Sequence, residues 1–106
     1  MTHIETCSGR KFPVTAPTPD DISIAEIAVA LSRCARFNGM TAPHLPAYSV
    51  AQHAVRVSLA VPPADAMWGL LHDAAEAYIG DIASPVKQLL ADVIDPIEDK
   101  ILAAVV

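Results

Sequence analysis

The chain has 106 residues, of which 53% are hydrophobic and 18% are charged. This composition excludes a disordered chain and predicts one small domain with a buried core. The formal net charge is −5, and because a nucleic-acid polymer binds to a basic surface, we expect no such partner. No apolar run approaches the length of a membrane span, and the N-terminus lacks the pattern of a signal peptide, so we expect a cytoplasmic protein with no membrane partner.

The first part of the chain, residues 1–20, is expected to form an extended entry to this domain. Ser8-Gly9 separates two short stretches of mixed polarity within residues 3–14, which favours a small β-hairpin. Three prolines between positions 13 and 19 then favour a stiff linker.

Two capping boxes mark the first two expected helices. Ser23 and Glu26 predict a helix over about residues 24–36. Ser49 and Gln52 repeat the pattern and predict a second helix that ends near residue 61. At helical spacing, the first helix is expected to bury four apolar side chains, namely Ile24, Ile27, Ala28 and Leu31.

Prolines and a glycine delimit the remaining helices. A long apolar helix is predicted from Pro63 or Ala64 through Tyr78, ended by Gly80. Ser84-Pro85 and Asp95-Pro96 each combine an N-cap residue with a proline at the first helical position, and so predict a fourth and a fifth helix. The expected fold class is all-α or mainly α, a helical bundle with a short N-terminal β-hairpin.

Polar residues interrupt the third helix, which is otherwise expected to be buried. His72 and Glu76 share a helical face, and Asp73 lies about 100° around the axis from His72. His53, on the preceding helix, offers a second imidazole. Two imidazoles and a carboxylate suit a metal ion with positions open for water and substrate. The alternative is a salt-bridged surface stripe, but no Lys or Arg occurs between Ala64 and Lys87 to complete one.

This spacing resembles that of a known family. Residues 71–87, together with residues 31–39 and 48–53, are similar to the HD-domain metal-dependent phosphohydrolases. The similarity is greatest to the branch of bacterial 5′-deoxynucleotidases and phage deoxynucleotide phosphohydrolases, and it extends over nearly the whole chain from about Ser8. It implies an HD-type helical bundle.

The resemblance implies metal-binding and catalytic roles. The implied metal ligands are His53, His72 and Asp73. Glu76 matches a residue that orients or deprotonates the attacking water, and Asp81 matches a position associated with the sugar or with that water. The implied cofactor is one divalent ion, with Mn or Co favoured and Fe, Ni, Zn or Mg as alternatives.

Substrate contacts are implied for three further residues. Arg36 matches an arginine that contacts phosphate near the metal, Phe37 matches an aromatic residue beside the nucleoside, and Lys87 is a candidate for phosphate binding. Each has an alternative that stays open. Arg36 also suits a cap on the first helix, Phe37 suits the core, and Lys87 suits a solvated lysine.

One departure from the family concerns the metal. The family uses a further Asp on a later helix as a ligand, and residues 89–106 resemble the region before it. Asp92, Asp95 and Asp99 precede that place and are expected to be caps or solvated charges. We therefore expect residues 1–106 to be a single HD-type domain that is truncated at its C-terminus, and inactive or weakened unless water or another chain replaces the ligand.

The expected function is metal-dependent hydrolysis of a small nucleotide substrate, a deoxynucleoside mono- or triphosphate, by a metal-activated water. Two alternatives remain: a non-catalytic or inactive metal- or nucleotide-binding HD-domain remnant or oligomeric interaction module, and a structural bundle without metal. The apolar residues 102–106 predict self-association, and hence a homo-oligomer.

Overall fold

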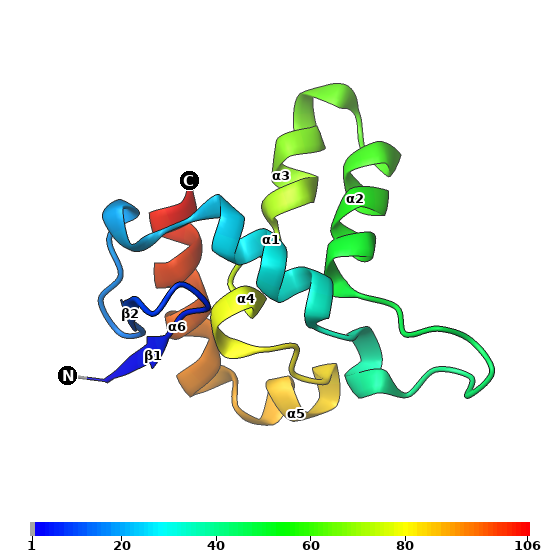
Figure 1. Ribbon diagram of the computed structural model, residues 1–106, viewed down its shortest axis with the longest axis horizontal. Helices are drawn as coiled ribbons and strands as arrows, with labels where there is room; N and C mark the ends of the chain where they lie inside the picture. Colours follow the sequence, from blue (N-terminus) through cyan, green and yellow to red (C-terminus); the bar gives the residue numbers. More distant parts are fainter. Residues whose placement is uncertain (1) are drawn as a thin grey trace.

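A computed structural model describes residues 2–106 as a helical protein with a small antiparallel sheet at its N-terminus (Figure 1). The expected fold class, mainly α with an N-terminal hairpin, is confirmed. Among the described residues, no helix has both the length and the apolar character needed to cross a membrane. The elements in chain order are β1 (His3–Glu5), β2 (Lys11–Pro13), η1 (Pro19–Asp21), α1 (Ile24–Arg33), η2 (Arg36–Gly39), α2 (Val50–Ala60), η3 (Pro63–Asp65), α3 (Ala66–Leu71), α4 (Glu76–Ile79), α5 (Ser84–Leu89) and α6 (Ala91–Val105).

The hairpin closes one side of the hydrophobic core. Its turn contains Gly9 with a φ of 76°, a conformation that glycine adopts without steric cost. Phe12 on β2 is almost fully buried, and its ring stacks on that of Tyr78 with centroids 3.8 Å apart. The core therefore joins the hairpin to α1, α4 and α6, and its buried members are Phe12, Ile27, Leu31, Val50, Ala74, Ala75, Tyr78 and Ile101.

Only half of the first predicted capping box forms. The Ser23 hydroxyl accepts a hydrogen bond from the Glu26 amide, as expected. The Glu26 carboxylate does not return to the helix start; it accepts a hydrogen bond from the Thr6 hydroxyl and pairs with Arg10. Glu26 is 4% exposed, so the hairpin captures this carboxylate as a buried tertiary contact.

The buried face of α1 also differs from the prediction. Ile27 and Leu31 are buried, but Ile24 is 59% exposed and Ala28 is exposed as well. The capture of Glu26 by the hairpin explains the shift, because it turns the face that carries Glu26 and Ile27 toward the core.

The first helix ends at Arg33, three residues before the predicted end. Ala35 forms an isolated antiparallel bridge with Ser49. The amide of Arg36 donates to the Tyr48 carbonyl at 2.7 Å. That amide is therefore unavailable to the helix, and the bridge carries Arg36 to the start of α2.

The predicted long third helix is divided. A 3-10 turn opens it, α3 ends at Leu71, and the chain passes through tight turns at residues 72–75 before α4. The reason lies in the backbone, since Ala74 donates to the Leu71 carbonyl and Glu76 to the Asp73 carbonyl, each three residues back. At about three residues per turn, residues i and i+3 point the same way, so Asp73 and Glu76 are now the aligned pair. Gly80 ends the segment with a φ of 84°, as expected.

The last two helices also begin elsewhere than predicted. Ser84 is the first residue of α5 and not its cap. α6 begins at Ala91, so Pro96 lies inside it although the sequence placed it at a helix start. Pro96 has no amide hydrogen, yet hydrogen bonds from Val93 and Ile94 to the Leu90 carbonyl have already started the helix.

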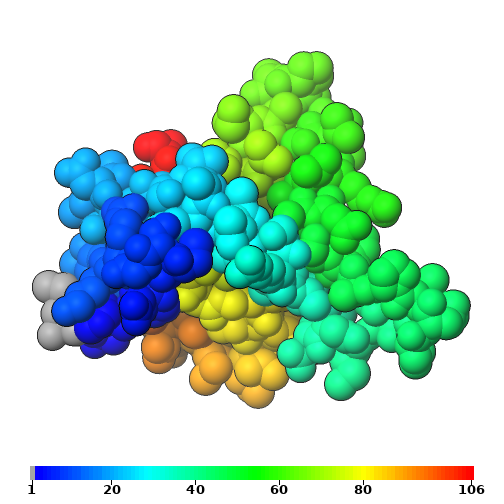
Figure 2. All heavy atoms as spheres, in the orientation of Figure 1, coloured from blue at the N-terminus to red at the C-terminus, as the bar shows by residue number. Residues whose placement is uncertain are grey.

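The α2–α3 pair projects from the rest of the molecule as a lobe (Figures 1 and 2). Gly69 allows the two helices to approach closely, because a Cβ at this position would lie 3.2 Å from backbone atoms of Ser58. The expectation that the third helix is buried holds only for its end. Trp68 is 66% exposed, while Ala74, Ala75 and Tyr78 are buried.

Candidate metal centre

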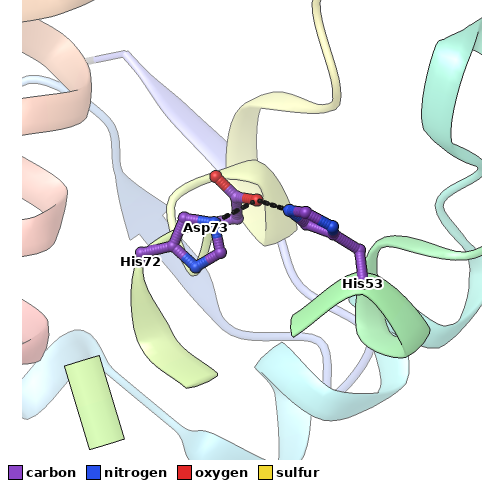
Figure 3. A group of neighbouring side chains, drawn as sticks. All are labelled: His53, His72 and Asp73. Carbon is purple, nitrogen blue, oxygen red and sulfur yellow. Dashed lines mark ion pairs between the residues drawn. The ribbon is translucent and has the colours of Figure 1, made fainter. Parts of the chain in front are cut away.

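The three residues expected to bind a metal lie together where α2 faces the end of α3. Their potential ligand atoms are all within 4.8 Å of one another. The Asp73 Oδ2 atom is 3.0 Å from Nε2 of His72 and 3.5 Å from Nε2 of His53. Figure 3 shows this carboxylate between the two imidazole rings. The three side chains are partly buried, and as a group they can hold a metal ion.

His72 has the proton arrangement of a metal ligand. Its Nδ1 atom lies 2.6 Å from the carbonyl oxygen of Gly69, and because a carbonyl only accepts, Nδ1 must be the donor. In a neutral ring, Nε2 then presents a lone pair to Asp73 Oδ2 at 3.0 Å. Two acceptors this close require a proton or a metal cation between them. Metal-binding histidines commonly donate the other ring N–H to a backbone carbonyl in this way.

His53 has the opposite arrangement. Its Nδ1 atom lies 3.2 Å from Nη1 of Arg36, and because a guanidinium only donates, Nδ1 must be the acceptor. The proton of the neutral ring is therefore on Nε2, the atom that faces Asp73. Burial, followed by the charge of Arg36, lowers the pKa of His53 and favours the neutral ring.

Arg36 sits at the edge of this cluster and does not cap α1. Its guanidinium carbon is 4.6 Å from the ring centroid of Phe37 and 6.0 Å from that of Tyr48, within the range of cation–π contacts. Arg36 thus supplies a cation beside the acidic and imidazole groups, which the sequence between Ala64 and Lys87 lacks. The absence of Lys and Arg from that segment is therefore a weaker argument for a metal than it was from the sequence.

Phe37 is not a core residue. It is 55% exposed, and its φ of 57° lies in the left-handed region that non-glycine residues seldom adopt. Its ring lies open beside Arg36, where a ligand could reach it.

Two further residues near Arg36 were missed from the sequence. They are Tyr48, whose ring lies near Arg36, and Arg56, whose guanidinium carbon is 5.2 Å from the centroid of that ring. Arg56 follows His53 by one helical turn, and this spacing was an available signal. The position of Tyr48 depends on the β-bridge between residues 35 and 49, which no local sequence pattern predicts.

Glu76 lies outside the compact group of ligand atoms but belongs to its electrostatic surroundings. Burial, followed by the charges of Asp73 and Asp81, raises the pKa of Glu76 to about 8. At neutral pH this carboxyl is therefore mostly protonated. A divalent cation held by Asp73 would lower that pKa and restore the carboxylate, which a water-activating residue needs.

Asp81 follows Gly80 in the loop after α4. Its charge raises the pKa of Glu76 and partly offsets the lowering of the His53 pKa. It also affects Cys34, whose pKa is raised mainly by burial. Asp81 is thus close enough to act on the site electrostatically, although it is not one of the grouped ligands.

Lys87 is partly exposed, but it is not free. Its Nζ atom lies 2.6 Å from a carboxylate oxygen of Glu98 on α6. This hydrogen bond raises the pKa of Lys87, and the lysine charge in turn lowers that of Glu76. A phosphate would have to compete with Glu98 for this side chain.

An apolar cavity of about 610 Å³ adjoins His72. The Trp68 ring stacks on the His72 imidazole with centroids 5.5 Å apart. Leu102 and Val105 pack against the core from α6, while Val106 is fully exposed. The cavity is lined by Met67, Trp68, Leu71, His72, Leu102, Val105 and Val106.

Comparison with known proteins gives relatives without a described function. Uncharacterized protein YfdR from Escherichia coli K12 is 49% identical over 92 residues, which are 87% of this chain and 50% of YfdR. Uncharacterized protein RCAP_rcc00048 from Rhodobacter capsulatus is 40% identical in an alignment 105 residues long, which covers 92% of this chain and 53% of that protein. The chain spans about half the length of these curated relatives. No family model matches the chain.

Proposed function

We propose that this chain binds one divalent metal ion through His53, His72 and Asp73 and that the site hydrolyses phosphate from a nucleotide. The observation that carries this proposal is the grouping of the three side chains, in which His72 Nε2 and Asp73 Oδ2 lie 3.0 Å apart and need a cation or a proton between them. A metal ion between them relieves their repulsion and uses the lone pair that the Gly69 carbonyl has selected.

The donor set is compatible with the chemistry. Imidazole nitrogens and a carboxylate suit Mn, Fe, Co, Ni or Zn, with Mg also possible, and Mn or Co remain our first choice. Such an ion polarises a phosphoryl oxygen and lowers the pKa of a bound water. Three protein ligands leave positions for that water and for the substrate.

The residues around the ligands have distinct proposed roles. Glu76 orients the water or accepts its proton, and Asp81 supports the water or the sugar. Arg36 binds the phosphate, beside the exposed ring of Phe37, which borders the nucleoside. Lys87 contributes to phosphate binding only if it exchanges its contact with Glu98 for one with the substrate.

The substrate class rests on the resemblance to the HD-domain phosphohydrolases, and it is a deoxynucleoside mono- or triphosphate. The rival proposal is a non-catalytic metal-binding module. The raised pKa of Glu76 in the metal-free chain does not separate the two proposals, because a cation held by Asp73 would restore the carboxylate in both.

The decisive experiment incubates the chain with Mn²⁺ or Co²⁺ and a panel of deoxynucleoside mono-, di- and triphosphates, and measures release of phosphate. His72→Ala and Asp73→Ala should abolish the release, and His44→Ala, a change at an exposed histidine in the loop before α2, should retain it. Metal binding without phosphate release from any substrate supports the non-catalytic module. If neither metal ion raises the melting temperature, the metal site itself is rejected.

A further inference from the structure

The contact between Arg36 and His53 sets a condition on metal binding. A neutral imidazole that gives the lone pair of Nε2 to a metal carries its proton on Nδ1. In the structure, Nδ1 of His53 accepts from Nη1 of Arg36 at 3.2 Å. One nitrogen cannot carry a proton and accept one at the same time, so this contact and coordination through Nε2 exclude each other.

We infer that His53 and an anionic ligand compete for Arg36, and that metal binding at His53 releases Arg36 from the imidazole and makes it available to the anion. This inference rests on the metal site of the proposed function and goes beyond it, because it couples the metal and the anion through the proton position of one imidazole. The change conserves protons at that ring, since Nε2 gives one to solvent and Nδ1 takes one up.

The surroundings of Arg36 suit such an exchange. Its guanidinium carbon lies 4.6 Å from the Phe37 ring centroid, and that aromatic contact does not depend on the His53 proton. The side chain is only partly buried and is paired with no carboxylate within the part of the chain that the structure describes. Once it leaves His53, its charge is free to meet an anion near the metal.

The position of the His53 proton can be observed directly. Long-range ¹H–¹⁵N spectra distinguish the two neutral tautomers of each histidine, and Zn²⁺ is a suitable probe because it is diamagnetic. We expect His72 to carry its proton on Nδ1 with and without Zn²⁺. We expect His53 to change from Nε2–H to Nδ1–H when Zn²⁺ is added.

Variants of Arg36 test whether this side chain weakens metal binding. Arg36→Met removes the donor and should tighten Mn²⁺ binding by about five- to tenfold, the equivalent of one typical intramolecular hydrogen bond. Arg36→Lys keeps the charge but loses the planar donor that stacks on Phe37, so its Mn²⁺ affinity should lie between those of the original protein and of Arg36→Met. Arg56→Met is the matched control, because it removes the same charge from beside Tyr48 without touching His53, and it should change the affinity by about twofold or less.

The anion gives the second half of the test. Saturating inorganic phosphate should tighten Mn²⁺ binding more in the original protein than in Arg36→Met, because reciprocal coupling between two ligands requires the shared group. A His53 that already carries its proton on Nδ1 without Zn²⁺, or equal effects of Arg36→Met and Arg56→Met, would overturn the inference while leaving the metal site intact. Histidine resonances that do not respond to Zn²⁺ would instead reject the metal site.

Discussion

The two histidines of the candidate metal centre both face the Asp73 carboxylate, but different groups hold the other nitrogen of each ring. His72, at the end of α3, is fixed by the carbonyl of Gly69, which belongs to its own helix. His53, in the first turns of α2, is fixed by Arg36, which lies 17 residues away in the sequence and reaches it through the bridge before α2. A carbonyl in the helix backbone cannot move away from the ring, whereas an arginine side chain can.

This difference separates a preorganised ligand from a conditional one. His72 already carries a proton on Nδ1, so metal binding at Nε2 leaves the hydrogen bond to the Gly69 carbonyl in place. At His53, the same metal must displace Arg36 and move a proton. A site built this way keeps half of its ligand geometry fixed and makes the other half dependent on a neighbouring cation.

Removal of each histidine gives the largest test of this contrast. His72→Ala should weaken Mn²⁺ binding by at least about 100-fold, because loss of a ligand costs no less than loss of a residue that orients a ligand, for which about 10- to 100-fold is typical. His53→Ala should weaken it by a smaller factor, because the original protein uses part of the His53 binding energy to displace Arg36. Titration with Mn²⁺ measures both affinities, and His44→Ala controls for loss of an exposed histidine. Equal losses of Mn²⁺ affinity in His53→Ala and His72→Ala would show that the two histidines do not differ as ligands.

The charge of Glu76 provides a second test, carried out without metal. Its folded pKa of about 8 lies above the ordinary value of 4.5. Such a group stabilises the fold fully below the ordinary value, and this contribution is lost as the pH rises toward 8. Glu76→Gln should therefore melt like the original protein at pH 4 and be more stable at pH 9 by about 2 kcal/mol, a figure reduced to allow for partial solvent exposure.

Mn²⁺ should reduce the difference in stability between Glu76→Gln and the original protein at pH 9, because a cation beside Asp73 favours the Glu76 carboxylate. Melting curves at both pH values measure the effect. A melting temperature of Glu76→Gln that falls below that of the original protein at pH 9 would show that Glu76 is stabilising as a carboxylate, against the expected direction.

The distance between α2 and α3, which carry or adjoin the two histidines, offers a finer test of the metal site. Gly69→Ala places a Cβ 3.2 Å from the Ser58 backbone and should move α3, with His72, away from α2. The helix propensity of alanine offsets much of the steric cost, so stability should change by less than about 1 kcal/mol. Mn²⁺ affinity should nevertheless fall about threefold to tenfold, because the ligands separate. A large loss of stability without any loss of metal affinity would show that His53 and His72 do not depend on this helix contact.

Self-association is the smallest effect expected, and it remains a prediction. The apolar surface differs from the one anticipated, because Leu102 and Val105 pack against the core while Met67 and Trp68 are each 66% exposed. Trp68→Ser should reduce any dimer fraction seen by light scattering without changing the His72–Gly69 hydrogen bond. A monomeric mass at all concentrations would contradict the homo-oligomer.

Local chemistry explains which predictions from the sequence were confirmed. The α2 capping box forms with Ser49 and Gln52, the hairpin forms around Ser8-Gly9, and Gly80 ends helix α4. Each of these features depends on atoms within a few residues. The predictions that were wrong depend on distant partners: α1 lost its last turn to the Tyr48 carbonyl, and Glu26 left its capping box for Thr6 and Arg10.

The site shows the same division. The sequence by itself determined that one imidazole lies on a helix and that a second imidazole and a carboxylate lie at the end of the next, because helical patterns and residue types are local properties. Only the tertiary structure decided which nitrogen of each ring faces Asp73, because that depends on what reaches the other nitrogen. The Gly69 carbonyl reaches it in one ring and the Arg36 guanidinium in the other, and a donor and an acceptor impose opposite proton positions.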